Sequence, residues 1–241
     1  MPGVHLQCAA RMLSASSRTV CRTAKARLLH LPPALPDLST NRCLALPQYI
    51  SRSPYPIFLL CNVLTPAQCD ALVAATEYIG FVPALTNDGT GAEAYKPHLR
   101  SSMRCIVDAP LYADQLYGIV RSALNDLDTH VRGLNPRLRV LKYAVGDRFV
   151  RHRDGVYVAA DGASESRYTM QLYLNDGYTG GRTAVWVPMG EGAATRKGSV
   201  EIEVEKGMAV VFDHRVLHEG KAVEDGVKYA VRMDVMVGTG R

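Results

Sequence analysis

The chain has 241 residues, of which 47% are hydrophobic and 21% are charged. This composition excludes fibrous and disordered classes, and an all-β fold of this length can be one domain. The net charge of +5 comes from the N-terminal part, because residues 1–60 hold seven basic residues and one acid, against 21 basic and 22 acidic residues beyond. Bulk charge therefore gives no sign of a nucleic-acid partner, and no apolar run reaches the roughly 20 residues of a membrane helix.

Residues 1–45 are expected to form a basic tail outside the folded domain. They are rich in Arg, Ser and Ala and contain no acid before Asp37. Organelle transit peptides share this composition, so mitochondrial or plastid import competes with a disordered terminus in a cytoplasmic protein. The six cysteines form no CxxC pair, which favours reduced thiols in an intracellular compartment over a zinc ribbon or a redox motif.

Two helices are predicted in the segment of about residues 60–130. Thr65 can cap the first helix, Pro66 suits its first position, Gln68 completes a capping box and Gly80 can end it. The second helix is expected from Pro110 to about residue 126. The residues expected to face the core are Cys69, Leu72, Val73, Thr76 and Ile79 in the first helix, and Leu111, Leu116, Ile119, Val120, Ala123 and Leu124 in the second.

From Leu138 onward the hydrophobic pattern has the period of two that is typical of strands. A turn at Gly146 and Asp147 and a polar loop over residues 155–166 interrupt it. Short strands following two helices predict a mainly β double-sheet jelly roll with supporting helices, in a single domain over residues 46–241 with its core at about 138–237. The predicted strands cover residues 138–145, 148–151, 167–175, 183–187, 200–205, 208–212 and 228–237.

Two segments carry the residue types of a metal site. His152 and Asp154 are two residues apart on a predicted strand, so their side chains point to the same face. His218 supplies a second imidazole, and Lys228 follows it ten residues later. Two histidines and one carboxylate, with open positions opposite them, suit a non-haem Fe(II) oxygenase. His214 competes with His218, and Asp147 competes weakly with Asp154.

Residues 138–237 resemble the catalytic domain of Fe(II)- and 2-oxoglutarate-dependent oxygenases, in particular the prolyl 4-hydroxylase-like branch. The resemblance implies a double-stranded β-helix, a cupin-like jelly roll, and a dioxygenase that uses Fe(II), 2-oxoglutarate, O2 and ascorbate. The landmarks are Tyr143-x-x-Gly146-x-x-Phe149-x-x-His152-x-Asp154, Arg167 to Asn175, Gly180-Gly181-Arg182-Thr183, Gly207-x-x-x-x-Phe212, His218-x-Gly220 and Lys228-Tyr229.

The resemblance also implies roles for several of these residues. His152, Asp154 and His218 would be the iron ligands, and Lys228 would bind the far carboxylate of 2-oxoglutarate. Arg232 lies on the same face four residues later and is the second candidate for that carboxylate, with an ion pair to Asp234 as its alternative. Two tyrosines, Tyr143 and Tyr173, would donate hydrogen bonds to the cosubstrate, and Thr169 shares the face of Tyr173.

The substrate is the least constrained prediction. Arg167 matches an arginine near the substrate in relatives of the prolyl hydroxylase type, and Arg100 loosely matches their Arg-Thr-Ser stretch. Ser101 departs from that stretch, which weakens the case for proline as the substrate. We expect hydroxylation of a C–H bond, on a peptide side chain such as proline or on a small metabolite or alkylated base. A catalytically silent module that binds metal or keto acid is the alternative class.

Overall fold

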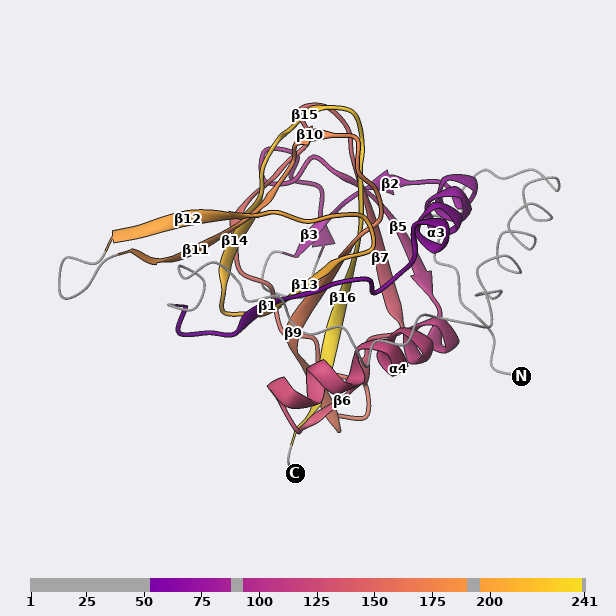
Figure 1. Cartoon of the computed structure of the whole chain (residues 1–241), viewed down its shortest axis with the longest axis vertical. Coiled ribbons are helices and arrows are strands. Elements are labelled where there is room, and N and C mark those ends of the chain that lie inside the picture. Colours follow the sequence, from indigo (N-terminus) through magenta and orange to yellow (C-terminus); the bar gives the residue numbers. More distant parts are fainter. Residues whose placement is uncertain (1–52, 88–92, 190–195, 240–241) are drawn as a thin grey trace.

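The computed structural model describes residues 53–87, 93–189 and 196–239, so the predicted basic tail lies outside the described residues. Most of the described chain forms two facing antiparallel sheets, with two helices beside the larger sheet (Figure 1). This arrangement confirms the predicted double-stranded β-helix with helical support. The alternating strands dictate it, because each sheet has one face that must be buried against another layer.

The larger sheet has eight strands in the order β1-β13-β9-β16-β7-β5-β2, with β6 paired to β16. Its two longest strands are central and antiparallel, with Tyr173 of β9 opposite Ala230 of β16 and Thr169 opposite Asp234. The strands are β1 (Ile57–Leu60), β2 (Val82–Pro83), β5 (Met103–Asp108), β6 (Val131–Leu134), β7 (Arg137–Tyr143), β9 (Ser164–Tyr173), β13 (Ala209–Asp213) and β16 (Lys228–Gly238).

The smaller sheet has four strands in the order β12-β11-β14-β8, and its β11–β12 hairpin projects from the body of the molecule (Figure 1). Two further strand pairs, β10–β15 and β3–β4, are short. Their bounds are β8 (Phe149–His152), β11 (Thr183–Met189), β12 (Arg196–Ile202), β14 (Leu217–Gly220), β10 (Thr179–Gly180), β15 (Val223–Asp225), β3 (Thr86–Asn87) and β4 (Glu93–Ala94). Neither short pair was among the predicted strands, and in the smaller sheet β14, which carries His218, was also not predicted.

The helices α3 (Pro66–Ile79) and α4 (Pro110–Leu127) cover the outer face of the larger sheet (Figure 1). The predicted capping box of α3 is confirmed: Thr65 accepts a hydrogen bond from the backbone of Gln68, and Gln68 accepts one from the backbone of Thr65. Gly80 ends this helix at a φ of 96°, a value at which residues with a Cβ are strained.

One predicted core residue of α4 is placed differently. Leu111 is 67% exposed, whereas Tyr112 and Ala113 are buried. The helix begins at Pro110, so Leu111 belongs to its first turn, and the buried stripe instead runs through Tyr112, Leu116, Val120 and Leu124. The sequence pattern therefore predicted the helix correctly but assigned one exposed leucine of its first turn to the core.

We expect Thr65→Ala to lower the free energy of unfolding by about 1 kcal/mol, because it removes the side-chain acceptor of the capping box. Chemical denaturation of the purified protein measures this change. Thr65→Ser keeps the hydroxyl and should stay close to wild type. Equal losses in both variants would show that the methyl group of Thr65, rather than its cap, is what matters.

One hydrophobic core joins α3 and α4 to the larger sheet, and a second core fills the space between the two sheets and ends at the predicted site. Tyr173, Val185, Val210 and Phe212 are buried there, and the centroid of the Phe212 ring lies 4.5 Å from that of His218.

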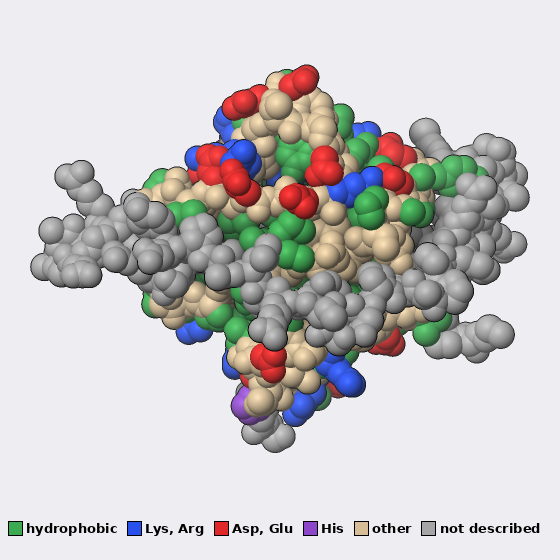
Figure 2. Space-filling view, viewed as in Figure 1, with side chains coloured by type: hydrophobic (Ala, Val, Ile, Leu, Met, Phe, Trp, Pro, Cys, Tyr) green, Lys and Arg blue, Asp and Glu red, His purple; other side chains and the backbone are tan. Residues whose placement is uncertain are grey.

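Neither helix in the described part of the chain has the length and apolar character to span a membrane. On the face drawn in Figure 2, basic and acidic side chains lie next to one another rather than in a patch of one sign.

Candidate active site

The two predicted histidine ligands face each other across adjacent strands of the smaller sheet. His152 ends β8, and His218 lies opposite it in β14. Their rings are 4.2 Å apart between centroids. The pairing of β8 with β14 therefore brings together two imidazoles that are 66 positions apart in the sequence.

Hydrogen bonds fix how both rings are turned. Nδ1 of His152 lies 2.8 Å from the carbonyl oxygen of Val150, and Nδ1 of His218 lies 3.1 Å from that of Val216. A carbonyl oxygen can only accept a hydrogen bond, so each Nδ1 is the donor that carries the hydrogen, and each Nε2 keeps its lone pair. Burial, followed by the adjacent His218, lowers the pKa of His152 to about 3, and burial also lowers the pKa of His218. Both rings are neutral at pH 7, as metal binding requires.

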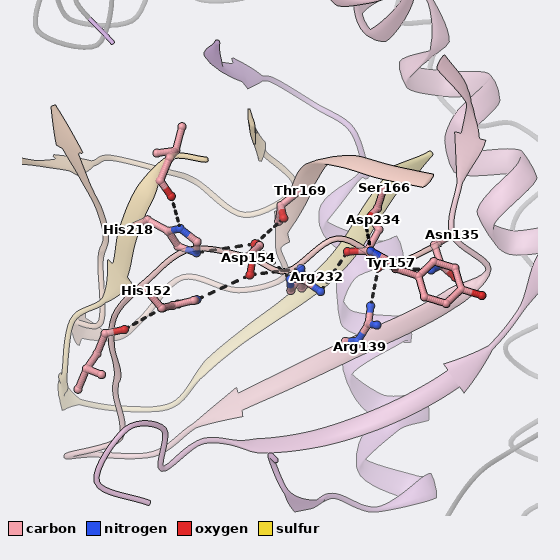
Figure 3. Close-up of polar contacts among 12 residues, drawn as sticks. Asn135, Arg139, His152, Asp154, Tyr157, Ser166, Thr169, His218, Arg232 and Asp234 are labelled. Atoms are coloured by element: carbon pink, nitrogen blue, oxygen red, sulfur yellow. Dashed lines mark hydrogen bonds and ion pairs between the residues drawn. The ribbon is translucent and has the colours of Figure 1, made fainter. Parts of the chain in front are cut away.

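Asp154 completes the group just beyond the end of β8. Its Oδ1 lies 3.7 Å from Nε2 of His152, and its Oδ2 lies 3.8 Å from Nε2 of His218 (Figure 3). Burial favours the neutral carboxyl, but the Arg232 guanidinium and the hydrogen bond from Thr169 outweigh it and hold the pKa of Asp154 well below its usual range. The carboxylate is therefore ionised at neutral pH.

These three side chains fit a divalent transition metal. Their ligand atoms lie within 4.8 Å of one another, and the set of two imidazole nitrogens and one carboxylate oxygen suits Fe(II). The competing residues do not join this cluster. Asp147 accepts a hydrogen bond from the backbone of Ala144 in the preceding turn. His214 is buried outside the cluster, and burial lowers the pKa of its ring.

Lys228 supplies a buried cation at the other end of the same interior. The residue is 3% exposed, and its Nζ donates to the carbonyl oxygen of Gly181. Burial lowers the pKa of Lys228 to about 7. Within the described residues, no carboxylate forms an ion pair with this ammonium group. An anionic ligand would therefore restore the charge on Lys228 and stabilise it there.

Aromatic rings surround Lys228, and two of them were predicted to contact the cosubstrate. Its Nζ lies 5.6 Å from the ring centroid of Tyr143, 5.2 Å from that of Tyr173 and 5.9 Å from that of Tyr178. Tyr143 is its register partner across β7 and β16. The faces of these rings attract a cation at Nζ. The site is therefore suited to a protonated Lys228 that is paired with an anionic ligand.

The turn before β11 depends on glycine. Gly180 has a φ of 66°, and a Cβ at this position would lie 2.5 Å from the carbonyl oxygen of Ala222. Residues with a side chain rarely adopt this φ, and the approach leaves no room for one. The Gly180–Gly181 turn thus places the carbonyl of Gly181 against Lys228.

Thr169 and Arg232 point toward Asp154 from neighbouring strands, β9 and β16. Thr169 Oγ1 donates to Asp154 Oδ2 at 2.5 Å. Nη2 of Arg232 lies 3.2 Å from Asp154 Oδ1, and its Nη1 lies 3.1 Å from Asp234 Oδ1. Each strand also carries a second site residue four positions away, Tyr173 on β9 and Lys228 on β16, so the two strands connect the metal-type cluster with the lysine.

Arg100 is a second buried cation near the cluster. It is 7% exposed, its Nε donates to Ser102 Oγ at 3.0 Å, and its guanidinium lies over the ring of Phe149. That ring in turn stacks on His152, with 3.5 Å between centroids. Burial lowers the pKa of Arg100, and the charge of Asp154 partly opposes this effect. No carboxylate within the described residues forms an ion pair with Arg100.

Arg167 does not reach the cluster. The β9–β16 register shifts next to it, because Val235 faces Tyr168 whereas the next residue, Met236, faces Ser166. This bulge breaks the alternation that the sequence pattern assumed. The Arg167 side chain instead forms an ion pair with Asp128 at 2.9 Å. Its assignment to the substrate rests on resemblance alone.

Three polar residues of the site, Gln171, Tyr178 and Thr183, were not assigned a role from the sequence. Tyr173 donates to Thr183 Oγ1 at 2.7 Å, and Gln171 Nε2 donates to the same oxygen at 3.0 Å. Tyr178 lies against Lys228. Gln171 was detectable, since it shares its strand face with Thr169 and Tyr173. Tyr178 lies in the loop before β10, where alternation gives no information, and Thr183 is the first residue of β11.

Comparison with known proteins shows that residues 138–233 are similar to non-haem iron enzymes that use a keto acid. Residues 138–233 match the family model described as the 2OG-Fe(II) oxygenase superfamily. This match confirms the resemblance that the sequence motifs predicted, and it supports a 2-oxoglutarate-dependent dioxygenase. No curated protein matches the chain significantly.

Solved structures share the fold at low identity. A prolyl-4-hydroxylase of Pseudomonas putida aligns with 76% of this chain and 92% of its own, at 18% identity and a TM-score of 0.55. A Trichoplax adhaerens prolyl hydroxylase, in complex with a hypoxia inducible factor oxygen degradation domain peptide fragment, aligns over 95% of both chains at 14% identity and a TM-score of 0.53. The epimerase SnoN from nogalamycin biosynthesis aligns over 79% of both chains, at 16% identity and a TM-score of 0.52. The shared fold thus does not select a substrate.

Proposed function

We propose that the protein hydroxylates an unactivated C–H bond, with Fe(II) held by His152, Asp154 and His218 and with 2-oxoglutarate held by Lys228. The observation that carries this proposal is the pairing of two incomplete sites in one interior. One is a set of two imidazoles and a carboxylate whose ligand atoms lie within 4.8 Å of one another. The other is a buried lysine without a carboxylate partner in the described residues. A divalent metal and a dianionic keto acid would complete both.

The metal and the keto acid would supply the oxidation: one oxygen atom of O2 enters succinate as CO2 leaves, and the other becomes the hydroxyl group of the product. The protein positions the reactants and excludes water. The backbone carbonyls at Val150 and Val216 hold the imidazoles with Nε2 free. Thr169 and Arg232 hold the carboxylate of Asp154.

Lys228 and the aromatic rings around it would bind the distal carboxylate of 2-oxoglutarate. A pair of unit charges about 4 Å apart gains roughly 4 kcal/mol at an effective dielectric near 20, before desolvation is subtracted. Tyr143 would add a hydrogen bond, because its side chain adjoins Lys228. The Tyr173 hydroxyl already donates to Thr183, so we assign Tyr173 to the wall of this subsite.

For the substrate we propose a peptide side chain, with Arg100 as the residue that binds a substrate carbonyl or carboxylate. Arg100 is buried beside the Phe149 and His152 rings and has no carboxylate partner in the described residues. Oxidation of a small metabolite is the second outcome of the same chemistry. The Arg167 side chain, engaged by Asp128, has no assigned contact in this proposal.

The test is a search for products heavier by one oxygen atom in peptide and metabolite pools. The purified protein is supplied with Fe(II), 2-oxoglutarate and ascorbate, the reductant that the resemblance implies. A hydroxylated peptide that appears only with active enzyme supports the proposal. A hydroxylated metabolite alone would redirect the substrate class. Loss of both products and of keto-acid binding would favour a silent module.

Arg100→Gln should reduce product formation by roughly 10- to 100-fold, because a hydrogen bond from a charged donor to the substrate is lost. Binding of 2-oxoglutarate should stay close to wild type, since Arg100 lies outside the lysine subsite. Both quantities are measured in parallel, by product mass spectrometry and by calorimetry. Arg148→Gln, at an exposed arginine of the neighbouring turn, is the matched control. Equal product yields in the two variants would remove Arg100 from the substrate site.

A further inference from the structure

Arg232 lies between two buried carboxylates at the inner end of the cluster. Its Nη2 lies 3.2 Å from Asp154 Oδ1, its Nε donates to Asp154 Oδ2 at 3.4 Å, and its Nη1 lies 3.1 Å from Asp234 Oδ1. The exposed fractions of the three side chains are 16%, 8% and 2% for Arg232, Asp154 and Asp234. All three guanidinium nitrogens therefore contact carboxylates.

The second carboxylate is held from the other side. Arg139 Nη1 lies 3.0 Å from Asp234 Oδ2, and Asn135 Nδ2 donates to the same oxygen at 3.3 Å. Figure 3 shows the resulting line of side chains, which runs from the two histidines through Asp154, Arg232 and Asp234 to Arg139. Two acids alternate with two arginines along it, so the line carries no net charge.

We propose that Arg232 is a positioning residue. While no metal is bound, its positive charge compensates the carboxylate of Asp154 as the metal cation would. The inference rests on the proposed metal site. A carboxylate that is 8% exposed needs a compensating charge to remain ionised in the interior. Arg232 supplies that charge from a rigid strand, and its planar fork fixes the orientation of the carboxylate.

This arrangement has a cost for metal binding. An incoming divalent ion meets a carboxylate whose charge Arg232 already neutralises. The positive charge of Arg232 repels a divalent ion. At a separation of about 6 Å, even with the dielectric constant of water, this repulsion weakens metal binding about tenfold. Arg232 therefore stabilises the metal-free protein and weakens the intrinsic affinity for the metal. Its partner Asp234 keeps Arg232 in place whether or not the metal is bound.

The experiment compares Co(II) binding and thermal unfolding of the full chain in wild type, Arg232→Met and Arg139→Met. Arg139 is the matched control, because it contacts Asp234 but not Asp154. We expect Arg232→Met to lower the unfolding temperature of the metal-free protein, to bind Co(II) about tenfold more tightly than wild type, and to gain more stability from it. Arg139→Met should lose stability equally with and without Co(II).

Each other outcome decides a different point. Wild type that binds no Co(II) would refute the metal site of the proposed function. If wild type binds Co(II) and Arg232→Met binds it equally or more weakly, the proposed role of Arg232 is wrong while the metal site stands. Equal tightening of Co(II) binding in Arg139→Met would lead to the same conclusion. If Arg232→Met folds only with Co(II), the proposal is supported. If it folds in neither condition, Arg232→Gln is measured instead against the same criterion of tighter binding.

Discussion

His218→Ala is expected to abolish Fe(II)-dependent formation of succinate and to weaken metal binding by roughly 100-fold or more. Mutation of a residue that only orients a metal ligand lowers metal affinity by roughly 10- to 100-fold. Loss of a ligand itself should therefore lower the affinity by more than that. The remaining donors would be one imidazole and one carboxylate, which are too few for a facial triad. Calorimetric titration with Co(II) and a succinate assay measure the two effects.

Two histidines serve as controls for this variant. His214 is four residues away and buried, but it lies outside the cluster, so His214→Ala should retain metal binding. His130 is at the surface, with a side chain 66% exposed, and His130→Ala should match wild type in both assays. If His214→Ala loses the metal while His218→Ala retains it, the third ligand has been assigned to the wrong histidine.

Lys228→Met should lower the affinity for 2-oxoglutarate by roughly 100-fold or more, because it removes the charge that faces the distal carboxylate. The same change should raise the stability of the protein without cosubstrate by roughly 2 to 4 kcal/mol, since a buried ammonium group without a carboxylate partner is replaced by an apolar chain. Calorimetry and chemical denaturation test the two effects separately. Lys221→Met, at a partly exposed lysine paired with Glu219, should change neither.

The pKa of Lys228 sets the direction of the pH dependence. Burial lowers this pKa from 10.5 to about 7, so the unfolded chain binds the proton more tightly than the folded one. The stability of the folded protein therefore rises with pH between about 7 and 10.5, because in this range the folded amine has lost its proton while the unfolded one still holds it. Lys228→Met should stabilise the protein most below pH 7 and least near pH 10.

Cosubstrate binding depends on the same proton in the opposite direction. Only the protonated lysine pairs with a carboxylate, so the affinity for 2-oxoglutarate should fall as pH rises above 7. At pH 8 the binding of 2-oxoglutarate should be accompanied by proton uptake, which calorimetry in buffers of different ionisation enthalpy detects. An affinity that stays constant from pH 6.5 to 9, without proton uptake, would contradict the subsite assigned to Lys228.

The sequence predicted the cluster well because short-range rules position most of it. Two-residue spacing placed His152 near Asp154, although the strand ends at His152 and the carboxylate follows it. His218 could be assigned only through its distance to Lys228, because the strand β14 that holds it is four residues long. Such a short strand lacks the alternation that would reveal it.

The sequence was least informative where the backbone departs from regular geometry or where charges meet across strands. The bulge at Arg167 redirects that side chain to Asp128, and a bulge leaves no clear mark in a hydrophobic pattern. The exposed Leu111 reflects the start of α4 at Pro110. For Arg232, spacing showed the correct face, but its choice between a cosubstrate and two carboxylates depends on Asp154, which is 78 positions away.

The most direct test of the oxygenase assignment is the conversion of isotopically labelled 2-oxoglutarate to succinate by the purified protein, followed by mass spectrometry. We predict succinate that requires both Fe(II) and O2, that is lost in His152→Ala and Asp154→Ala, and that increases when the substrate pool is added. Turnover that persists in His152→Ala or Asp154→Ala would contradict the assigned site. Absence of any turnover in wild type with Fe(II), ascorbate and the substrate pools would contradict the activity itself.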